Sequence, residues 1–430
     1  MNAETEPDPR PISAVSNGVG LAGLIGLLGW AIVARNLRFD GPDAALVALA
    51  ACGLPMLAWS LLIDRVHRNR STGIDWGTPP RPAAGSIDIS LVKLVGLWTI
   101  WGAIGCLYCI GRWYWSGNYL FAMQLLGAAA LPLLIVSVPY VLWLDRRLKE
   151  PRDGAWHFGR LVIGRPQGVE PAIVQDFLLG WAVKAFFLAF MISIVPGNWA
   201  DVVRAPADEI TAGPVQLVRF LIAAMFMVDV TFATVGYALT LKPLDAHIRS
   251  ANPFAAGWTA ALICYPPFIL MNPGGPLDYH PGTADWSYWL RSQPALLALI
   301  GAVLVVLTGI YAWATVAFGI RFSNLTHRGI ITHGPYAFSK HPAYLAKNLF
   351  WWLATLPFLA ASGSIVDAIR NSVILAIVSI VYYWRARTEE RHLSADPVYR
   401  DYAAWMERNG PIPRLFRAVR RAAAAPQPAE

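Results

Sequence analysis

The chain has 430 residues, of which 56% are hydrophobic and 14% are charged, and its net charge is +8. Soluble domains carry about 25% charged residues, and at a mean hydropathy of +0.44 these apolar side chains cannot all be hidden in one water-soluble core. The apolar runs are continuous rather than alternating, which excludes a membrane β-barrel. The basic residues are scattered over several loops, so we expect no nucleic-acid partner.

Ten apolar stretches approach the length of about 17–25 residues with which a helix crosses a bilayer. The seventh and ninth are short and contain proline (Pro266, Pro267 and Pro357), so they are candidates for kinked or re-entrant segments. We therefore predict an all-α, polytopic integral membrane protein with about ten transmembrane helices. The predicted spans are 17–34, 43–64, 88–111, 120–143, 172–195, 215–240, 257–271, 293–318, 345–361 and 365–384.

The loop charges predict the orientation of these spans. If the N-terminus is inside, the inner segments hold 25 of the 35 Lys and Arg residues, whereas the outer loops hold six. Because basic residues stay on the cytoplasmic side, we expect both termini inside, in a bacterial inner (plasma) membrane, with the basic face against anionic lipids. The acidic segment before the first span favours a retained helix over a signal peptide. The inner segments are 1–16, 65–87, 144–171, 241–256, 319–344 and 385–430.

Two polar clusters follow the eighth predicted span. The first is HGPYAFSKHPAYLAKN at 333–348, and the second is RARTEERHL at 385–393. Both lie on the predicted inner side and are separated by two short-linked spans that must pack as a hairpin. Arg385 and Glu389 are four residues apart and therefore share one helix face. We expect the two clusters to form one site at the cytosolic membrane surface.

These clusters resemble the C-terminal signature of the isoprenylcysteine carboxyl methyltransferase family. That signature is G-x-Y-x-x-x-R-H-P-x-Y, then R-x-x-x-E-E-x-x-L, then two tyrosines about three residues apart. The resemblance covers roughly 319–416, a quarter of the chain, and Lys340 stands where the family has Arg before His-Pro. The matching residues are Gly334, Tyr336, His341, Pro342, Tyr344, Arg385, Glu389, Glu390, Leu393, Tyr399 and Tyr402.

The resemblance implies methyl transfer from S-adenosyl-L-methionine to a lipophilic small molecule or a lipid-modified acceptor. It assigns Glu389 to the methionine ammonium, 328–331 to the adenosine and Arg385 to the carboxylate of the acceptor. The tyrosine faces suit a cationic sulfonium, and the Gly-Pro and His-Pro breaks leave backbone groups free to contact a ligand. The implied cofactor-binding residues are Arg328, Gly329, Ile330, Ile331, Tyr336, His341, Pro342, Ala343, Tyr344 and Glu389.

An ionised acceptor needs little general base, but an amine or hydroxyl acceptor would need one, and His341 or His392 would then serve. Four histidines gather here (His327, His333, His341 and His392), yet no H-E-x-x-H or Cys–His spacing supports a metal site. We therefore expect no metal. We predict an anionic acceptor, because a guanidinium at Arg385 would repel a cationic amine.

Two intramembrane charges lie outside this segment. Lys184 and Asp229 are both placed near the bilayer midplane by antiparallel spans, so we predict a buried ion pair between them, either structural or part of a substrate cavity. Two other functions remain open at this stage: an NADPH-dependent membrane reductase of the sterol-reductase type, and a non-catalytic lipid-binding or transport protein. The predicted division is a cytosolic tail at 1–16, about eight helices at 17–318, the methyltransferase-like segment at 319–416 and a disordered tail at 417–430.

Overall fold

The computed structural model describes residues 9–411 and residue 414. The predicted disordered tail and the first eight residues of the predicted N-terminal tail lie outside these described residues. The fold is all-α, as expected, apart from one two-residue antiparallel ladder. The α-helices are α1 (Asn17–Leu37), α2 (Pro42–Ala58), α3 (Ile87–Ile110), α4 (Tyr119–Asp145), α5 (Gly154–Val162), α6 (Pro171–Val203), α7 (Ala207–Thr211), α8 (Pro214–Ala238), α9 (Ala255–Leu262), α10 (Trp286–Trp289), α11 (Pro294–Phe318), α12 (Pro342–Thr355), α13 (Ile365–Leu393) and α14 (Pro397–Asn409).

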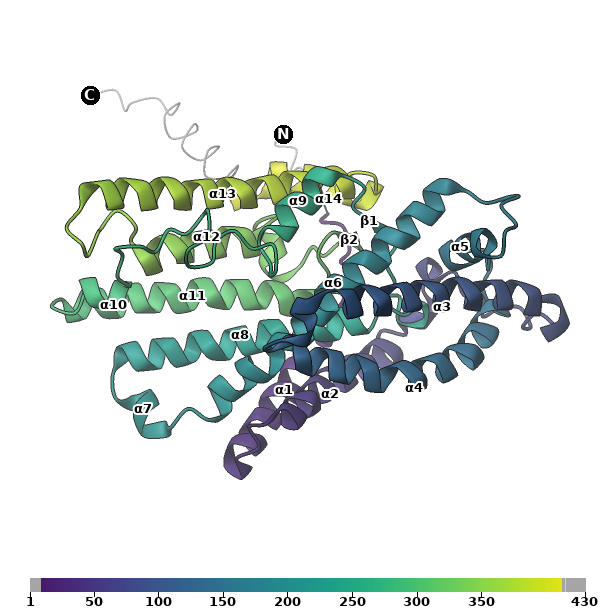
Figure 1. The fold of residues 1–430 in the computed structure, drawn as a ribbon, viewed down its shortest axis with the longest axis horizontal. Coiled ribbons are helices and arrows are strands. Elements are labelled where there is room, and N and C mark those ends of the chain that lie inside the picture. Colours follow the sequence, from purple (N-terminus) through teal and green to yellow (C-terminus); the bar gives the residue numbers. More distant parts are fainter. Residues whose placement is uncertain (1–8, 412–413, 415–430) are drawn as a thin grey trace, which may run out of the picture.

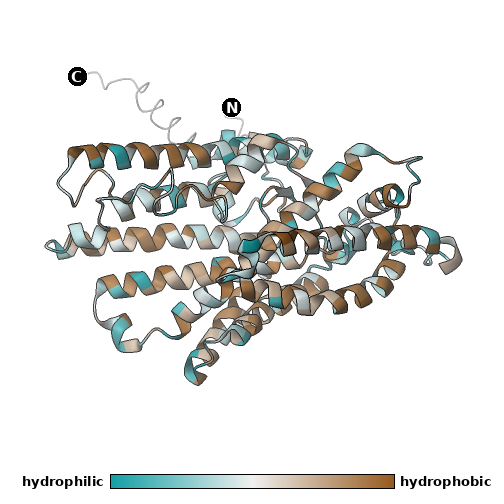
Figure 2. Cartoon of the chain, viewed as in Figure 1, coloured by the Kyte–Doolittle hydropathy of each residue, from teal (hydrophilic) through white to brown (hydrophobic). Residues whose placement is uncertain are grey.

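Eight helices of the described chain are long and apolar enough to cross a membrane, which confirms a polytopic membrane protein. They are α1, α2 with the turn that follows it, α3, α4, α6, α8, α11 and α13. Brown, hydrophobic residues dominate these helices in Figure 2. The other two predicted spans are shorter: α9 has 8 residues and α12 has 14. The predicted count of about ten transmembrane helices is therefore not confirmed. The proline-containing segment after α9 continues without helix as far as α10.

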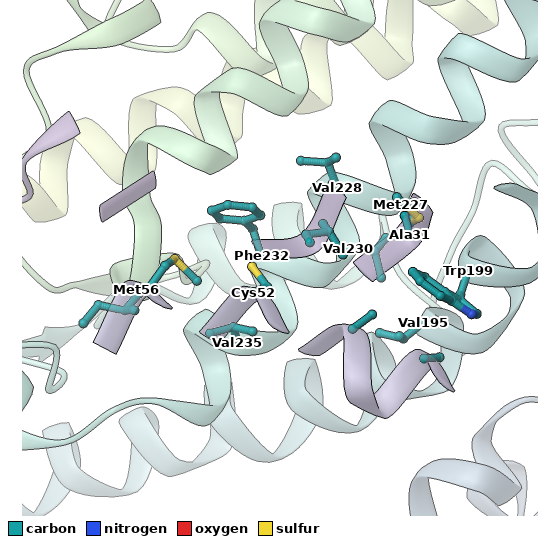
Figure 3. Close-up of a cluster of buried hydrophobic side chains, with 14 of the residues drawn as sticks. Ala31, Cys52, Met56, Val195, Trp199, Met227, Val228, Val230, Phe232 and Val235 are labelled. Atoms are coloured by element: carbon teal, nitrogen blue, oxygen red, sulfur yellow. The ribbon is translucent and has the colours of Figure 1, made fainter. Parts of the chain in front are cut away.

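The hydrophobic core lies where α1 and α2 meet α6 and α8 (Figure 3). Trp199 of α6 and Phe232 of α8 are almost fully buried in this cluster, and Phe232 lies beside Cys52 of α2. Small residues allow the close approach, because a Cβ at Gly26 of α1 would lie 2.0 Å from a backbone oxygen of α2. The helices that carry the site, α11, α12 and α13, lie roughly parallel to α8, on the side of α8 away from α1 and α2 (Figure 1).

The predicted inner segments meet at one end of the helices. Asp245 joins three of them, because its carboxylate accepts hydrogen bonds from Asn69, Ser71 and Arg321. The strands β1 (Ser250–Ala251) and β2 (Thr326–His327) join the segment after α8 to the segment after α11. Hydrogen bonds and ion pairs also link the described parts of 1–16, 144–171 and 385–430 to these segments. The side of the membrane that this end of the helices faces stays a prediction.

Candidate functional site

A single cavity at this end contains nearly all of the predicted site. Its wall comes from α11, the segment 319–341, the start of α12, the end of α13 and the tyrosines of α14. Every predicted site residue except Pro342 lines it. The segment 319–341 is largely non-helical, since Gly329 and Gly334 have positive φ angles of 108° and 58° and two X-Pro steps interrupt it. The two motifs thus meet as the sequence predicts.

Arg328 lies in this wall, but its side chain is already occupied. It is 2% exposed, and all five of its N–H groups donate to backbone carbonyls at 2.7–3.0 Å. These carbonyls belong to the end of α8 and to the segments around it, so the guanidinium fastens α8 to the chain that follows α11. Burial, with the nearby charge of Arg321, lowers the pKa of Arg328 to about 9. The side chain of Arg328 is therefore structural, and only the backbone of this residue is available to a ligand.

The acidic half of the cavity is built around Glu389. The Tyr344 hydroxyl donates to Glu389 Oε1, and His341 Nδ1 lies 3.8 Å from Oε2. The imidazole of His341 stacks on the Tyr344 ring, with centroids 5.7 Å apart. Glu390 is engaged elsewhere, at 2.8 Å from Lys340 Nζ and 3.2 Å from His341 Nε2. Of the two adjacent acids, Glu389 is therefore the one that faces the cavity.

Arg385 forms the other half. It is 2% exposed and lies against three aromatic rings, with its guanidinium carbon 5.0 Å from the centroid of Tyr344, 5.2 Å from Tyr382 and 5.6 Å from Tyr265. One Nη donates to Asn324 Oδ1 at 3.3 Å. No described acidic residue forms an ion pair with it, and its Nε has no hydrogen-bond partner in the described chain. A buried guanidinium that lacks an acidic partner favours the binding of an anionic ligand.

Other buried polar atoms in the wall also have no partner among the described residues. These are the hydroxyls of Thr326 and Tyr399, which line the cavity together with Arg385. Hydroxyls can donate to or accept from a purine or a ribose, so this donor set fits a nucleoside-bearing cofactor beside the residues 329–331. The sequence analysis missed Thr326, Asn324 and Tyr265 as wall residues, because they have no place in the two motifs.

The N-terminal segment covers the loop beside the cavity. The Ala14 amide donates to Ile330 O at 2.8 Å, and the hydroxyl of Thr332 donates to Pro11 O at 2.7 Å. A Cβ at Gly329 would lie 2.6 Å from the Ala14 side chain, so glycine permits this close approach. This contact between the chain's start and the segment after α11 was not foreseen.

The predicted Lys184–Asp229 pair is wrong. Lys184 donates to Thr240 at 2.7 Å and packs on the Trp181 ring, whereas Asp229 accepts from Tyr311 and Thr315 of α11. The reason is axial position: Thr240 lies eleven residues beyond Asp229, or about 16 Å along a helix axis. α6 begins at Pro171, thirteen residues before Lys184, and α8 ends at Ala238. Because Lys184 contacts Thr240, the first turns of α6 extend past the end of α8, and Lys184 lies level with that end and not with Asp229.

The histidines do not gather into a metal centre. In the described part of the chain no group of three His, Cys, Asp or Glu residues has a metal-binding arrangement. His392 lines the cavity and lies 2.9 Å from Ser250 Oγ, while His327 Nε2 lies 3.0 Å from Asp396. Burial, helped by Arg10, lowers the pKa of His333. His341 and His392, the two predicted bases, therefore both reach the cavity.

These features define a class: a polytopic membrane protein whose last helices build a ligand site of buried cations, tyrosines and one open carboxylate. Residues 295–395 match the isoprenylcysteine carboxyl methyltransferase family, so the chain carries a methyltransferase domain of this family from α11 to the end of α13. Methyltransferases of this family use S-adenosyl-L-methionine. No curated protein matches the chain, and no solved structure does. The recognition made from the motifs is confirmed.

Proposed function

We propose that the protein transfers a methyl group from S-adenosyl-L-methionine to the carboxylate of a lipophilic acceptor, of the isoprenylcysteine type, at the cytosolic membrane surface. The observation that carries the proposal is Arg385, a buried guanidinium without an acidic partner in the described chain. It opens on the same cavity as Glu389. The proposal therefore assigns the cation to the acceptor and the anion to the cofactor, within one cavity.

Each residue then has a role that follows from its position. Glu389 holds the ammonium of the cofactor's amino acid, and Tyr344 fixes that carboxylate by its hydrogen bond. The ring faces of Tyr336 and Tyr344 attract a cation, and burial raises the pKa of Tyr336, so its phenol stays neutral. The backbone of 329–331 and the hydroxyls of Thr326 and Tyr399 contact the adenosine.

When bound, the cofactor would supply a methyl group on a positively charged sulfur: the acceptor oxygen would form a bond to the methyl carbon as the carbon–sulfur bond breaks and S-adenosylhomocysteine leaves. Arg385 orients the carboxylate of the acceptor for this attack, and the aromatic cage excludes water from it. Because a carboxylate is already ionised, His341 and His392 need not remove a proton. Positioning and desolvation therefore supply most of the acceleration.

Thermal stabilisation of the detergent-solubilised protein tests the proposal. S-adenosylhomocysteine at about 100 times its Kd should stabilise the fold by about 2.7 kcal/mol and raise the melting temperature, whereas NADPH should not. The matching activity assay follows labelled methyl transfer to N-acetyl-S-farnesylcysteine. Stabilisation by NADPH would support a reductase, and a response to neither ligand would support a non-catalytic lipid-binding protein.

The cytosolic placement has its own test. A reporter that fluoresces only outside the cytoplasm, fused after Glu430, should stay dark, because the predicted inner segments hold most of the basic residues. The same reporter fused in the loop between α12 and α13 should fluoresce. A bright signal from the C-terminal fusion would reverse the topology and place the site on the other face.

A further inference from the structure

A second cation faces the same cavity as Arg385. Lys347 of α12 lines this cavity, and its ammonium lies 5.2 Å from the ring centroid of Trp351, 5.4 Å from Tyr311 and 5.7 Å from Tyr382. Tyr382 is also part of the cage around Arg385, at 5.2 Å. One aromatic ring therefore lies against both positive groups.

The two cations also lie at similar depth. Lys347 is five residues after the start of α12, and Arg385 is eight residues before the end of α13. Since both of these helix ends lie at the polar end of the bundle, the two residues start about 8 and 12 Å from it along their helices. A single acceptor head between α12 and α13 can thus reach both side chains.

Neither cation is neutralised by direct contact. In the described chain no acidic residue forms an ion pair with Lys347 or Arg385; the acids of α13 that form such pairs, Glu389 and Glu390, contact His341, Lys340 and Arg387. Asp229 accepts a hydrogen bond from the Tyr311 hydroxyl at 2.9 Å, and Lys347 lies against the ring of the same tyrosine. Asp229 therefore influences the ammonium without forming an ion pair with it. The cavity therefore presents two positive groups to whatever enters between α12 and α13.

The energetics favour an anionic group at each cation. An aromatic face stabilises a cation, but by less than burying an unpaired charge destabilises it. The two like charges also repel each other across a site of low dielectric constant. A second anionic group on the acceptor reduces both penalties, whereas a monocarboxylate at Arg385 leaves Lys347 unmatched.

We propose that the acceptor head carries two anionic groups, the reacting carboxylate at Arg385 and a second anion at Lys347. This rests on the proposed function for the identity of the reacting group. The acceptor class is then an amphiphile with a prenyl or similar chain and a dianionic head, such as a dicarboxylate. Lys347 is a specificity-determining residue in this proposal.

Two matched amphiphiles test it: S-farnesyl mercaptopropionate, with one carboxylate, and S-farnesyl mercaptosuccinate, with two. Their affinities are measured at mildly alkaline pH from thermal shifts of the full-length protein in lipid nanodiscs. Wild type should bind the dicarboxylate at least tenfold more tightly. Lys347→Met should remove most of this preference, Lys347→Arg should keep it, and the affinity for S-adenosylhomocysteine should stay unchanged in both.

The partition of the two amphiphiles into the lipid is the same for every variant. It therefore cancels when the ratio of their two affinities is compared between variants. Lys149→Met, at an exposed lysine outside the cavity, is the matched control and should leave the ratio unchanged. Equal affinities in wild type, or a ratio that Lys347→Met leaves intact, would overturn the inference, and Lys347→Gln replaces the Met variant if that one does not fold. If S-adenosylhomocysteine does not bind, the proposed function fails, yet the two amphiphiles still decide this point.

Discussion

Arg328 and Arg385 are both 2% exposed arginines in the wall of one cavity, and they differ in what surrounds their guanidinium groups. Arg328 donates all five of its N–H groups to protein carbonyls. Arg385 has three aromatic rings, one hydrogen bond at 3.3 Å and an Nε with no partner in the described chain. Burial and charge are the same, so hydrogen-bond saturation separates the structural arginine from the one available to a ligand.

The comparison extends to the helices that carry them. Arg328 belongs to the junction between α8 and the segment after α11, where backbone carbonyls are abundant because a helix ends there. Arg385 lies inside α13, whose own backbone is satisfied and offers no acceptors. A guanidinium in mid-helix must therefore find its partners among side chains or in a ligand.

The largest effect is expected at Arg328. Arg328→Met would leave five buried carbonyls without donors, at about 1–3 kcal/mol each, which together approach the whole stability of about 5–15 kcal/mol. We expect no monodisperse protein after solubilisation, measured by size-exclusion chromatography and thermal melting. Arg385→Met should yield a folded protein under the same conditions. A folded Arg328→Met variant that melts within a few degrees of wild type would remove the distinction between the two arginines.

The next effect concerns Glu389, which lies on the same face of α13 as Arg385. Glu389→Gln removes the anion expected to meet an ammonium, and a lost charge-assisted hydrogen bond costs about 1.5–3 kcal/mol. The affinity for S-adenosylhomocysteine should fall by roughly 10- to 150-fold, measured by titration calorimetry, while the melting temperature without ligand changes little. Glu407→Gln, at an exposed position of α14, is the control. Unchanged affinity in the Glu389 variant would show that the cofactor lies elsewhere.

A smaller effect sharpens the role of Arg385. Arg385→Lys keeps the charge but loses the planar, two-pronged donor geometry that matches a carboxylate. Turnover should fall by about tenfold or more, with the affinity for S-adenosylhomocysteine intact. Arg370→Lys, on the exposed part of the same helix, should have no such effect. Near-wild-type methylation by the Arg385 variant, or a cationic amine as the preferred acceptor, would contradict the proposed role.

The smallest effect concerns Asp245, whose partner Arg321 donates a hydrogen bond to Arg328 O at 2.9 Å. Burial alone would raise the pKa of Asp245, but Arg321 and hydrogen bonds from Asn69 and Ser71 hold it below its usual value. Because the pKa is lower in the folded state, this carboxylate stabilises the fold at neutral pH, and its contribution is lost as the pH falls below about 4. Asp245→Asn should therefore melt several degrees below wild type at neutral pH, and the difference should shrink in acid. A gap in melting temperature that stays constant with pH would show that the charge of Asp245 contributes nothing.

The sequence by itself was sufficient for the class of protein, the family and the pairing of the two motifs. Apolar length predicts a membrane helix because the bilayer fixes it, and eight of the ten predicted spans became long helices. The two motifs met because a short link between helices enforces a hairpin. Arg385 and Glu389 share a face for the local reason that they are four residues apart.

Only the tertiary structure decided which buried charged side chains already have hydrogen-bond or ion-pair partners within the protein. Three of the five partners of Arg328 come from 236–246, more than 80 residues away, and the partners of Asp229 come from α11, also more than 80 residues away. The partner of Lys184 likewise depends on how far α6 extends past the end of α8. Lys347 lies in the 333–348 cluster but at no position of the family signature, so its place in the cavity also came from the structure. Hydrogen-bond satisfaction depends on distances between distant segments, and these are set by packing, so a one-dimensional pattern identifies a buried charge without showing whether it is already paired.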